Sequence, residues 1–352
     1  MTQARTTVYD VARLAGVSRG TVDRVMNRRG RVSDESRMKV EEAVRELGYE
    51  PNASASLLAS RRTYRIAVLI PMPGEADYWR RIDDGFSEGE LQTGRFLNIE
   101  LLRYYYDQTD SSSFESEAAK LLEAGIDGAI LTDVFQLATR NLAAELHSRH
   151  IPYAFVDTKD ESLPYVLHYG VNPVKSGELA AYLLGLAAGE PKEIALIGIR
   201  RDPSLLADPN RARREGFIGY VGEHFPGCKL YPVFLDISSP PDIFRQMTDF
   251  VNTNPSVRNF AVLCSRTYLL REWLAANPDP ERVVIGFDDL DANMEALRDG
   301  LVTFLVTRHI SHQSRDILST FATYLAGGVL PEDRNVFVHM DILSKMNIDD
   351  YK

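Results

Sequence analysis

Three short stretches within residues 6–48 carry apolar residues at helical spacing. The first stretch reads TTVYDVARLAGVS, and its apolar residues on one face of a predicted helix are Val8, Val11, Ala12, Leu14 and Ala15. Thr7 is a suitable N-cap for this helix, and Gly16 is a suitable residue to end it.

The second and third stretches complete a small three-helix unit. Ser18 is placed to cap a second helix, whose residues expected to point inward are Val22, Val25 and Met26. Ser33 begins a third helix, SDESRMKVEEAVRELG, which Gly48 ends. Two short helices joined by a three-residue turn containing Gly are typical of a helix-turn-helix. Because each helix alone is marginal, we expect the three to bury their apolar faces together.

A proline then interrupts the helical pattern. In YEPNASASLLASRRT, Pro51 breaks the third helix and Asn52 is able to cap a short fourth segment. Leu57 and Leu58 would be exposed on this segment, which is too small to form a core. The pattern predicts a separate linker over residues 51–63.

From Tyr64 onward, short apolar runs alternate with amphipathic helical patterns. The runs predicted to be buried parallel strands are RIAVLIP (65–71), DGAILTD (127–133), PYAFVD (152–157), EIALIGI (193–199), FAVLCS (260–265) and RVVIGFDD (282–289). This alternation predicts right-handed βαβ units in doubly wound sheets, and its length predicts two lobes. Ligands of such folds bind beyond the carboxyl ends of the strands.

Charge divides the chain at the same place. The 352 residues carry a net charge of -10, which taken alone argues against binding to nucleic acid. Residues 1–62, however, contain 12 Lys or Arg and 8 Asp or Glu, whereas the remainder contains 28 and 42. A small basic head on an acidic body is the asymmetry expected when one end of a protein meets a polyanion.

Cysteine use and hydropathy favour the cytoplasm. Cys228 and Cys264, the two cysteines, form neither a disulfide framework nor a paired metal site. The polar N-terminus, MTQARTTVYD, does not resemble a signal peptide, and no apolar run approaches the roughly 18 residues that span a bilayer. We therefore expect a cytoplasmic protein.

The segment VYDVARLAGVSRGTVDRVMNRRGRVSDESRMKVEEAVRELGYEPN closely resembles the head of LacI/GalR-type transcriptional regulators. The similarity covers residues 6–60, and the body is similar to the type I periplasmic sugar-binding fold that these regulators carry. The implied domains are a DNA-binding head over 1–50, a hinge over 51–63 and an effector-binding domain over 64–352. The implied lobes are an N-lobe over about 64–163 plus 305–335 and a C-lobe over about 164–304 plus 336–352.

In that family the second helix enters the major groove of DNA. Arg19 and Gly20 match positions that face bases, Thr21 matches a phosphate contact, and Arg24 matches a base-edge contact. Arg pairs bidentately with guanine, which discriminates by roughly 1–3 kcal/mol per pair. Further residues that match contacts to the backbone or flanking bases are Tyr9, Asn27 and Arg31. The alternative is that these are solvated polar residues on a small bundle.

The segment after Pro51 is similar to the family's hinge helix. The resemblance places Asn52 among the DNA-contacting residues and Leu58 where a leucine enters the minor groove at the operator centre. Such a leucine unstacks a base step and kinks the duplex, at a cost of about a few kcal/mol recovered through added contact. Ser56 stands where the family often has Arg, and the leucines could instead pack on the body.

Asp23 is the residue of the second helix that least suits DNA binding. The family commonly has Ser there, which can donate to a phosphate, whereas an ionised aspartate repels one. The carboxylate could orient Arg19 or Arg24, or accept from cytosine N4, so that Asp23→Ser would raise general DNA affinity and loosen operator preference. The alternative is tolerance, with neighbouring arginines offsetting the charge.

The body offers residues suited to a carbohydrate, which binds to aromatic faces and to charged planar groups. By resemblance to sugar-binding proteins, Tyr78 and Trp79 are stacking candidates, although one of them could be core. Asp157 and Asp288 end two predicted strands where the family has hydroxyl-binding carboxylates, although each could cap a helix. Arg213 in NRARREGF matches the arginine that grips the sugar, the alternative being a surface ion pair.

Two positions depart from the family and bear on the charge of the ligand. Arg266 follows Cys-Ser where an Asn-Asp is usual, and Arg308 in FLVTRHISHQ stands where a Gln is common. If both face the cleft together with Arg213, the site is cationic and suits a sugar acid. If they instead pair with the two aspartates, the site suits a neutral sugar.

Enzymatic chemistry finds little support in the sequence. It contains no phosphate-cradling Gly-x-x-x-x-Gly-Lys, no Gly-x-Gly-x-x-Gly after a strand and no Gly-x-Ser-x-Gly elbow. His309 and His312 have helical spacing but no obvious third metal ligand. We expect no catalytic residues, no metal and no cofactor. The alternatives are an enzyme on a doubly wound fold and a carbohydrate-binding protein without a role on DNA.

The patterns and the resemblance together imply a homodimeric transcriptional regulator. We expect a repressor that binds double-stranded, pseudo-palindromic operator DNA. A carbohydrate-like effector (a sugar, polyol or sugar acid) in the interlobe cleft would close the lobes and bias the hinge, as an inducer or as a corepressor. The tail DILSKMNIDDYK lacks leucine heptads, which favours a dimer over a tail-bundled tetramer.

Overall fold

A computed structural model describes residues 7–26, 32–47, 62–74, 77–199, 210–237, 240–329 and 332–351. The chain divides into two compact units, Met1–Arg62 and Thr63–Lys352, which we call the head and the body. The expected DNA-binding residues that lie outside the described residues are Asn27, Arg31, Asn52 and Leu58. The expected hinge is likewise outside them except for its last two residues.

The head consists of three helices, α1 (Val8–Ala15), α2 (Arg19–Met26) and α3 (Asp34–Glu46). Gly16 ends α1 in a left-handed conformation with φ of 64°. The Ser33 hydroxyl caps α3, as the sequence predicts, by accepting from a backbone N–H in its first turn.

Apolar side chains from all three helices form the core of the head. Its buried members are Val11, Ala12, Ala15, Val22, Val40 and Ala43. Val25 and Met26 pack against this cluster, as expected. The prediction for Leu14 is wrong, because its side chain is 46% exposed. At about 100° per residue, Leu14 falls outside the arc shared by the buried residues of α1.

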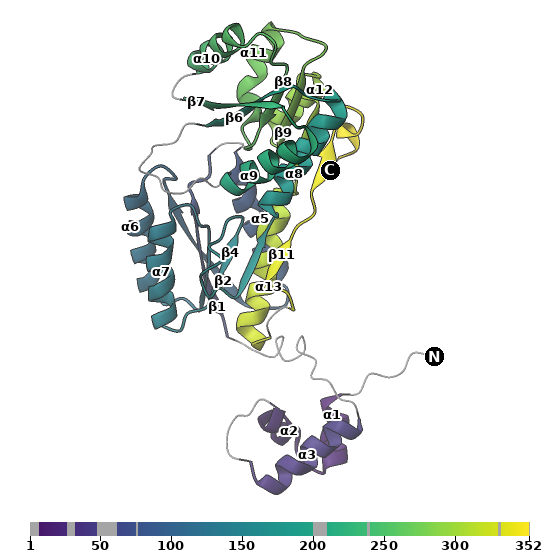
Figure 1. The fold of residues 1–352 in the computed structure, drawn as a ribbon. Coiled ribbons are helices and arrows are strands. Elements are labelled where there is room, and N and C mark those ends of the chain that lie inside the picture. The colour runs from purple at the N-terminus through teal and green to yellow at the C-terminus, as the bar shows by residue number, and fades with distance from the viewer. Residues whose placement is uncertain are drawn as a thin grey trace. The chain divides into compact units, whose positions relative to one another are not determined.

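The body contains two α/β lobes, which confirms the predicted fold class. Its first sheet, which defines the N-lobe, has the strand order β11 (Asn335–Phe337), β5 (Leu167–Gly170), β4 (Tyr153–Val156), β3 (Gly128–Leu131), β1 (Tyr64–Pro71) and β2 (Ile99–Tyr106). These strands pair in parallel. The helices on its two faces are α6 (Ser111–Glu123) and α7 (Gln136–Ser148) on one, and α5 (Tyr78–Thr93) and α13 (Ile310–Gly327) on the other (Figure 1).

The second sheet defines the C-lobe. Its strand order is β12 (Asp341–Leu343), β10 (Phe304–Thr307), β9 (Val283–Phe287), β8 (Asn259–Val262), β6 (Glu193–Ile199) and β7 (Lys229–Leu235), with β12 antiparallel to β10. Its helical segments are α8 (Pro173–Ala188), α9 (Arg211–His224), α10 (Pro240–Thr253), η1 (Thr267–Leu270), α11 (Arg271–Ala276), α12 (Asp291–Arg298) and η2 (Ile348–Asp350).

Both faces of the second sheet are covered, which explains its continuous apolar runs. Ile194 and Leu196 of β6 face the core under α8 and α9, whereas Ala195 and Ile197 face the core under α10 and α11. Successive side chains on a strand point to opposite faces, so a strand buried on both sides has no polar alternation.

The chain passes between the lobes three times, a few residues later than the sequence indicates. Residues 167–170 form β5 of the N-lobe and residues 304–307 form β10 of the C-lobe. The short strand β5 carries a histidine and a tyrosine, so its four residues give no apolar run. Among the described residues, no helix is long and apolar enough to span a membrane.

Two helix pairs pack at very close range, one in each lobe. A Cβ added at Gly85 of α5 would collide with the Ser311 carbonyl of α13, and one at Gly177 of α8 would collide with the Arg213 carbonyl of α9. Glycine is required at both contacts because the backbone of the partner helix occupies the place of a side chain. The backbones of each helix pair are therefore in direct contact.

Candidate functional site

Two aspartates occupy corresponding places at the carboxyl ends of the two sheets. Asp157 follows β4 and Asp288 follows β9, and both have φ of 67°. Their backbone N–H groups donate to the adjacent strand, to Tyr169 and Val306 carbonyls respectively, each at 2.9 Å. Non-glycine residues held in this left-handed region are costly and are concentrated at functional sites. Asp288 does not cap helix α12 (Asp291–Arg298), because the N-cap position is Leu290, which makes no side-chain cap hydrogen bond.

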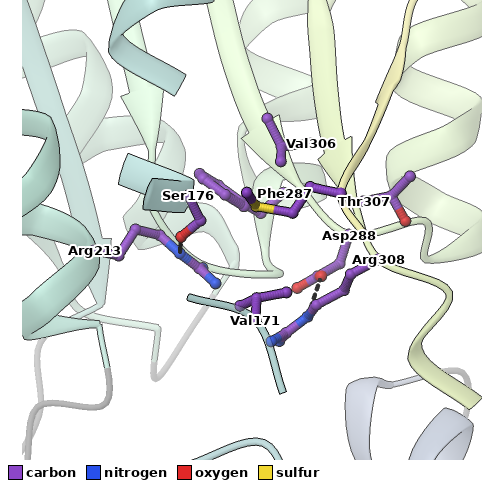
Figure 2. A pocket seen from close by; sticks show the side chains of 9 residues that line it. Val171, Ser176, Arg213, Phe287, Asp288, Val306, Thr307 and Arg308 are labelled. Carbon is purple, nitrogen blue, oxygen red and sulfur yellow. Dashed lines mark hydrogen bonds and ion pairs between the residues drawn. The ribbon is translucent and has the colours of Figure 1, made fainter. Parts of the chain in front are cut away.

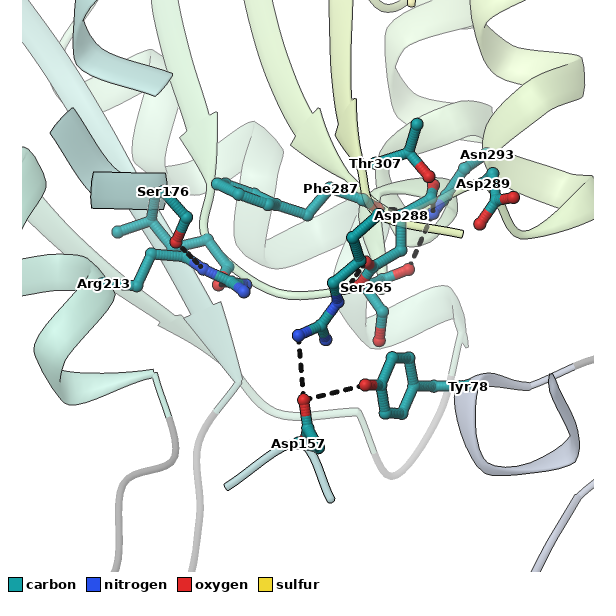
Figure 3. A network of polar contacts seen from close by, with 12 residues as sticks. Tyr78, Asp157, Ser176, Arg213, Ser265, Phe287, Asp288, Asp289, Asn293 and Thr307 are labelled. Carbon is teal, nitrogen blue, oxygen red and sulfur yellow. Dashed lines mark hydrogen bonds and ion pairs between the residues drawn. The ribbon is translucent and has the colours of Figure 1, made fainter. Parts of the chain in front are cut away.

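Arg308 joins these two aspartates. It follows β10, and its Nη1 lies 2.8 Å from Asp157 Oδ1 while its Nε lies 3.2 Å from Asp288 Oδ1. Tyr78, the first residue of α5, donates its hydroxyl to the same Asp157 oxygen at 2.8 Å. The guanidinium carbon of Arg308 lies 4.8 Å from the centre of the Tyr78 ring. These four side chains form one polar network between the two sheets. Figure 3 shows the Tyr78 hydroxyl and the Asp157 carboxylate joined within it.

Burial sets the electrostatics of this network. Arg308 and Asp288 are 8% and 1% exposed. Burial raises the pKa of Asp288, and the guanidinium groups of Arg308 and Arg213 oppose that shift. Burial likewise disfavours the charge of Arg308, but Tyr78, Asp288 and Asp157 outweigh it and raise the pKa of that guanidinium. Arg308 therefore stays charged and needs both carboxylates as partners.

Arg213, in the first turn of α9, is the second buried arginine of the site. Its Nε donates to Ser176 Oγ and its Nη1 to the Leu263 carbonyl, both at 3.0 Å. The guanidinium carbon lies 4.0 Å from the centre of the Phe287 ring. Among the described residues Arg213 makes no ion pair within 4 Å, and burial lowers its pKa. Arg213 thus keeps donor capacity for a ligand.

A small pocket lies between the two arginines (Figure 2). Its lining residues are Val171, Ser176, Arg213, Phe287, Asp288, Val306, Thr307, Arg308 and Met340. The empty space, part of which is open to solvent, is about 160 Å³. The Arg308 side chain takes up part of the space between the sheets.

The His168 side chain contacts the backbone of Asp157. Its Nε2 lies 3.0 Å from the Asp157 carbonyl oxygen. Because a carbonyl oxygen can only accept a hydrogen bond, Nε2 must be the nitrogen that carries the hydrogen. The other nitrogen, Nδ1, is buried without a partner among the described residues. Burial lowers the pKa of His168 to about 4, so the ring is neutral near pH 7.

Asn293 has the corresponding place beneath Asp288. Its side-chain amide donates to the carbonyls of Ser265, Phe287 and Asp288 at 2.8, 2.9 and 3.1 Å. Its Oδ1 accepts from the Tyr268 N–H at 2.7 Å. Asn293 is fully buried, and it ties the loop after β8 to the loop after β9.

The two histidines with helical spacing lie beside this site. The rings of His309 and His312 are stacked with centres 4.8 Å apart. His309 Nε2 is 3.0 Å from an Asp341 carboxylate oxygen, and its Nδ1 is 3.3 Å from the Tyr351 hydroxyl. Within the described part of the chain, no three side chains that could bind a metal come together.

The expected base-reading residues of the head are exposed on α2. Arg19 Nη1 donates to the Tyr9 hydroxyl at 2.8 Å, with the guanidinium carbon 5.4 Å from the ring centre. Arg24 Nε donates to the Gly20 carbonyl at 3.0 Å, and the Thr21 hydroxyl lies 3.0 Å from that of Ser18. The Asp23 side chain is outside the described set.

Comparison with known proteins assigns both units. Residues 66–328 match the family described as "Periplasmic binding protein domain", and residues 7–52 match "Bacterial regulatory proteins, lacI family". The chain belongs to the periplasmic binding protein family and carries a lacI-family head. These matches confirm the prediction that the chain resembles LacI-type regulators.

The relatives of the lacI-family head and the binding-protein body are regulators. The HTH-type transcriptional regulator DegA of Bacillus subtilis is 31% identical over 214 residues, 59% of each sequence. Catabolite control protein A of Staphylococcus xylosus is 52% identical over 65 residues, 18% of this chain and 20% of that protein. The chain thus aligns with 59% or less of these relatives.

Solved structures give the same picture for the binding-protein body. A Bacteroides fragilis structure assigned as a LacI transcriptional regulator has a TM-score of 0.78 at 26% identity, covering 83% of this chain and 100% of that one. GanP, a glucose-galactose binding protein from Geobacillus stearothermophilus, has a TM-score of 0.70 at 17% identity, covering 82% and 99%. The second match shows the fold alone.

Five of the seven effector-site residues expected from the sequence meet in the binding-protein body: Tyr78, Asp157, Arg213, Asp288 and Arg308. Arg213, Asp288 and Arg308 line the pocket, whereas Tyr78 and Asp157 contact Arg308 from the N-lobe. Trp79 packs edge-on against Tyr78 with ring centres 5.1 Å apart. Arg266 is half-buried before η1 and, among the described residues, pairs with neither aspartate.

Sequence reasoning missed the residues that support the site. Four residues contact site residues that lie 5 to 74 positions away in the sequence: Ser176, Phe287, His168 and Asn293. Only Phe287 carried a signal, since it precedes Asp288 at the end of a predicted strand.

Proposed function

We propose that this protein is a sequence-specific DNA-binding transcriptional regulator controlled by a small carbohydrate-like molecule. The observation that carries the proposal is the union of a lacI-family head with a body in which the buried residues Arg213, Asp288 and Arg308 line one pocket. Arg308 also pairs with Asp157 of the other lobe. Regulation of DNA binding requires both parts in one chain. We further propose that it acts in the cytoplasm as a homodimeric repressor.

Exposed donors on α2 support the DNA-binding part of this proposal. Arg19, Gly20, Thr21 and Arg24 lie on one short helix, and Tyr9 orients Arg19 from α1. Two such heads in a dimer would read the two halves of a pseudo-palindromic operator in successive major grooves. Asn27, Arg31, Asn52, Leu58 and Asp23 remain part of this proposed interface on the basis of the resemblance.

The charges of the pocket favour a neutral polyhydroxylated effector over a sugar acid. Arg308 is paired with Asp157 and Asp288, so it does not add a free positive charge to the pocket. Arg213 offers donors without a carboxylate partner among the described residues, and the Phe287 and Tyr78 rings lie nearby. A ring with several hydroxyls would use both carboxylates as acceptors and Arg213 as a donor.

Titration calorimetry with matched pairs of neutral and acidic sugars tests the proposed ligand class. We expect the neutral member of a pair to bind at least about tenfold more tightly, because an acid would confront two buried carboxylates. Tighter binding of the acid would contradict this assignment.

A gel shift with fragments of genomic DNA tests the proposed class of protein. We expect the full chain to retard particular fragments and Arg19→Ala to lose that selectivity, at a cost of about 1–3 kcal/mol. Arg45→Ala, which removes the same charge from an exposed position on α3, is the matched control. Sugar binding without any DNA binding would favour a carbohydrate-binding protein without a regulatory role.

A further inference from the structure

Arg308 lies at a passage between the lobes. It follows β10 of the C-lobe and precedes α13, which packs on the N-lobe sheet and on α5. A side chain at this place can reach groups of both lobes. Helix α13 begins at Ile310, two residues after Arg308.

The contacts of Arg308 bridge the lobes. Asp157 belongs to the N-lobe, at the end of β4, whereas Asp288 belongs to the C-lobe, at the end of β9. The contact with Tyr78 of α5 adds a second interaction with the N-lobe. Figure 2 shows the guanidinium of Arg308 beside the Asp288 carboxylate of the same lobe.

From this arrangement we propose that Arg308 is an interlobe clasp, which holds the cleft closed when no effector is bound. Opening would separate Asp157 from Arg308, while the pair with Asp288 would remain inside the C-lobe. The clasp therefore favours the closed form by one buried, charge-assisted contact and one cation–π contact.

The clasp would also affect how an effector binds at the proposed site, an inference that rests on the proposed function. The pocket beside Arg308 has about 160 Å³ of empty space, and both aspartates already accept hydrogen bonds from Arg308. An effector whose hydroxyls donate to these Oδ1 atoms would compete with Arg308 for at least one aspartate. Its binding then replaces an internal contact between the lobes instead of creating the first one.

A second ion pair between the lobes supplies a control. Arg81 of α5 and Asp291 of α12 approach to 2.8 Å, with side chains 38% and 74% exposed. Exposed ion pairs contribute little to stability, whereas breaking a buried one is costly. If the clasp holds the lobes, the buried contact and not this exposed one must control closure.

Single-molecule energy transfer between dyes on the two lobes of the full-length, ligand-free chain tests the clasp. The dyes are attached at Ala144→Cys of α7 and Ala275→Cys of α11, both exposed positions. All variants share a background with Cys228→Ser and Cys264→Ser, which removes both native thiols. The readout is the ratio of open to closed molecules.

Asp157→Asn is the decisive variant, because it removes the interlobe ion pair and leaves Arg308 paired with Asp288. We expect the open-to-closed ratio to rise about tenfold or more, the effect of losing one charge-assisted contact. Arg81→Gln should change the ratio less than about threefold. Arg308→Gln should open the cleft as well, and circular dichroism would show whether that variant remains folded.

An unchanged ratio in folded Asp157→Asn, or equal opening in Arg81→Gln, would overturn the clasp. The result does not depend on DNA. If the protein fails to bind any genomic fragment while Asp157→Asn opens the lobes, the clasp stands and the regulatory proposal fails. If DNA binding is selective and the lobes stay closed in both variants, the reverse holds.

Discussion

At the scale of single residues, the site depends on two polar side chains that do not line its pocket. His168 holds the carbonyl of Asp157, and Asn293 holds the carbonyl of Asp288. Both aspartates have a left-handed backbone, so each needs a fixed partner to keep its carboxylate aimed at Arg308. The carboxylates were predictable from their place after apolar runs. Their supports were not, because they come from other strands and helices.

His168 should make folding stability depend on pH. Its pKa rises from about 4 in the folded protein to the ordinary 6.5 in the unfolded chain. Between pH 6.5 and pH 4, His168 binds a proton in the unfolded chain but stays neutral in the folded protein. The free energy of unfolding therefore falls as the pH is lowered from 6.5 to 4, by up to about 3 kcal/mol.

Denaturant unfolding of the wild type and His168→Gln across pH 4–7 checks this prediction. The variant should lose the His168 part of the pH dependence, so the difference between the two proteins should vary across this window. Asp133, whose pKa burial raises to about 6, acts in the opposite direction but is common to both proteins and cancels. Parallel curves for the two proteins would disprove the assignment.

At the scale of helices and strands, the sequence was informative wherever burial was complete. The six apolar runs correspond to β1, β3, β4, β6, β8 and β9, which lie inside the sheets or under helices on both faces. The edge strands β2 and β7 were not identified, because exposed and half-exposed side chains interrupt their apolar runs. The short strand β5 was missed because a histidine and a tyrosine interrupt it. The residues of β5 at 167–170 also explain why the lobe boundary lies later than expected.

The close contact between α5 and α13 gives a prediction at this scale. Gly85→Ala should lower the free energy of unfolding by about 2–3 kcal/mol or more, because its Cβ would meet the Ser311 backbone, which cannot yield easily. Thermal unfolding monitored by circular dichroism measures the change.

Gly219→Ala on α9 is the matched control for this substitution. A Cβ there meets nothing within 4 Å, and alanine favours a helix over glycine by up to about 1 kcal/mol. This variant should be as stable as the wild type or slightly more so. Equal effects of the two substitutions would show that the contact between α5 and α13 is looser than described.

At the scale of the whole molecule, the distribution of charge agrees with separate roles for the two units, DNA binding by the head and ligand binding by the body. The basic head carries exposed arginines on a lacI-family helix, and the acidic body buries its functional charges between two sheets. The resemblance in the sequence identified both units, but it did not show that Arg308 is paired. The pairing of Arg308 depends on how the residue after β10 of one lobe contacts the residue after β4 of the other.

Selection of bound sequences from a random pool of double-stranded DNA tests the central claim most directly. The full-length protein should enrich one pseudo-palindromic motif with two half-sites, Arg19→Ala should abolish or relax the preference at a defined base, and Arg45→Ala should retain it. Enrichment of no motif, or of the same motif by Arg19→Ala with unchanged strength, would contradict the assignment of this protein as a sequence-specific regulator.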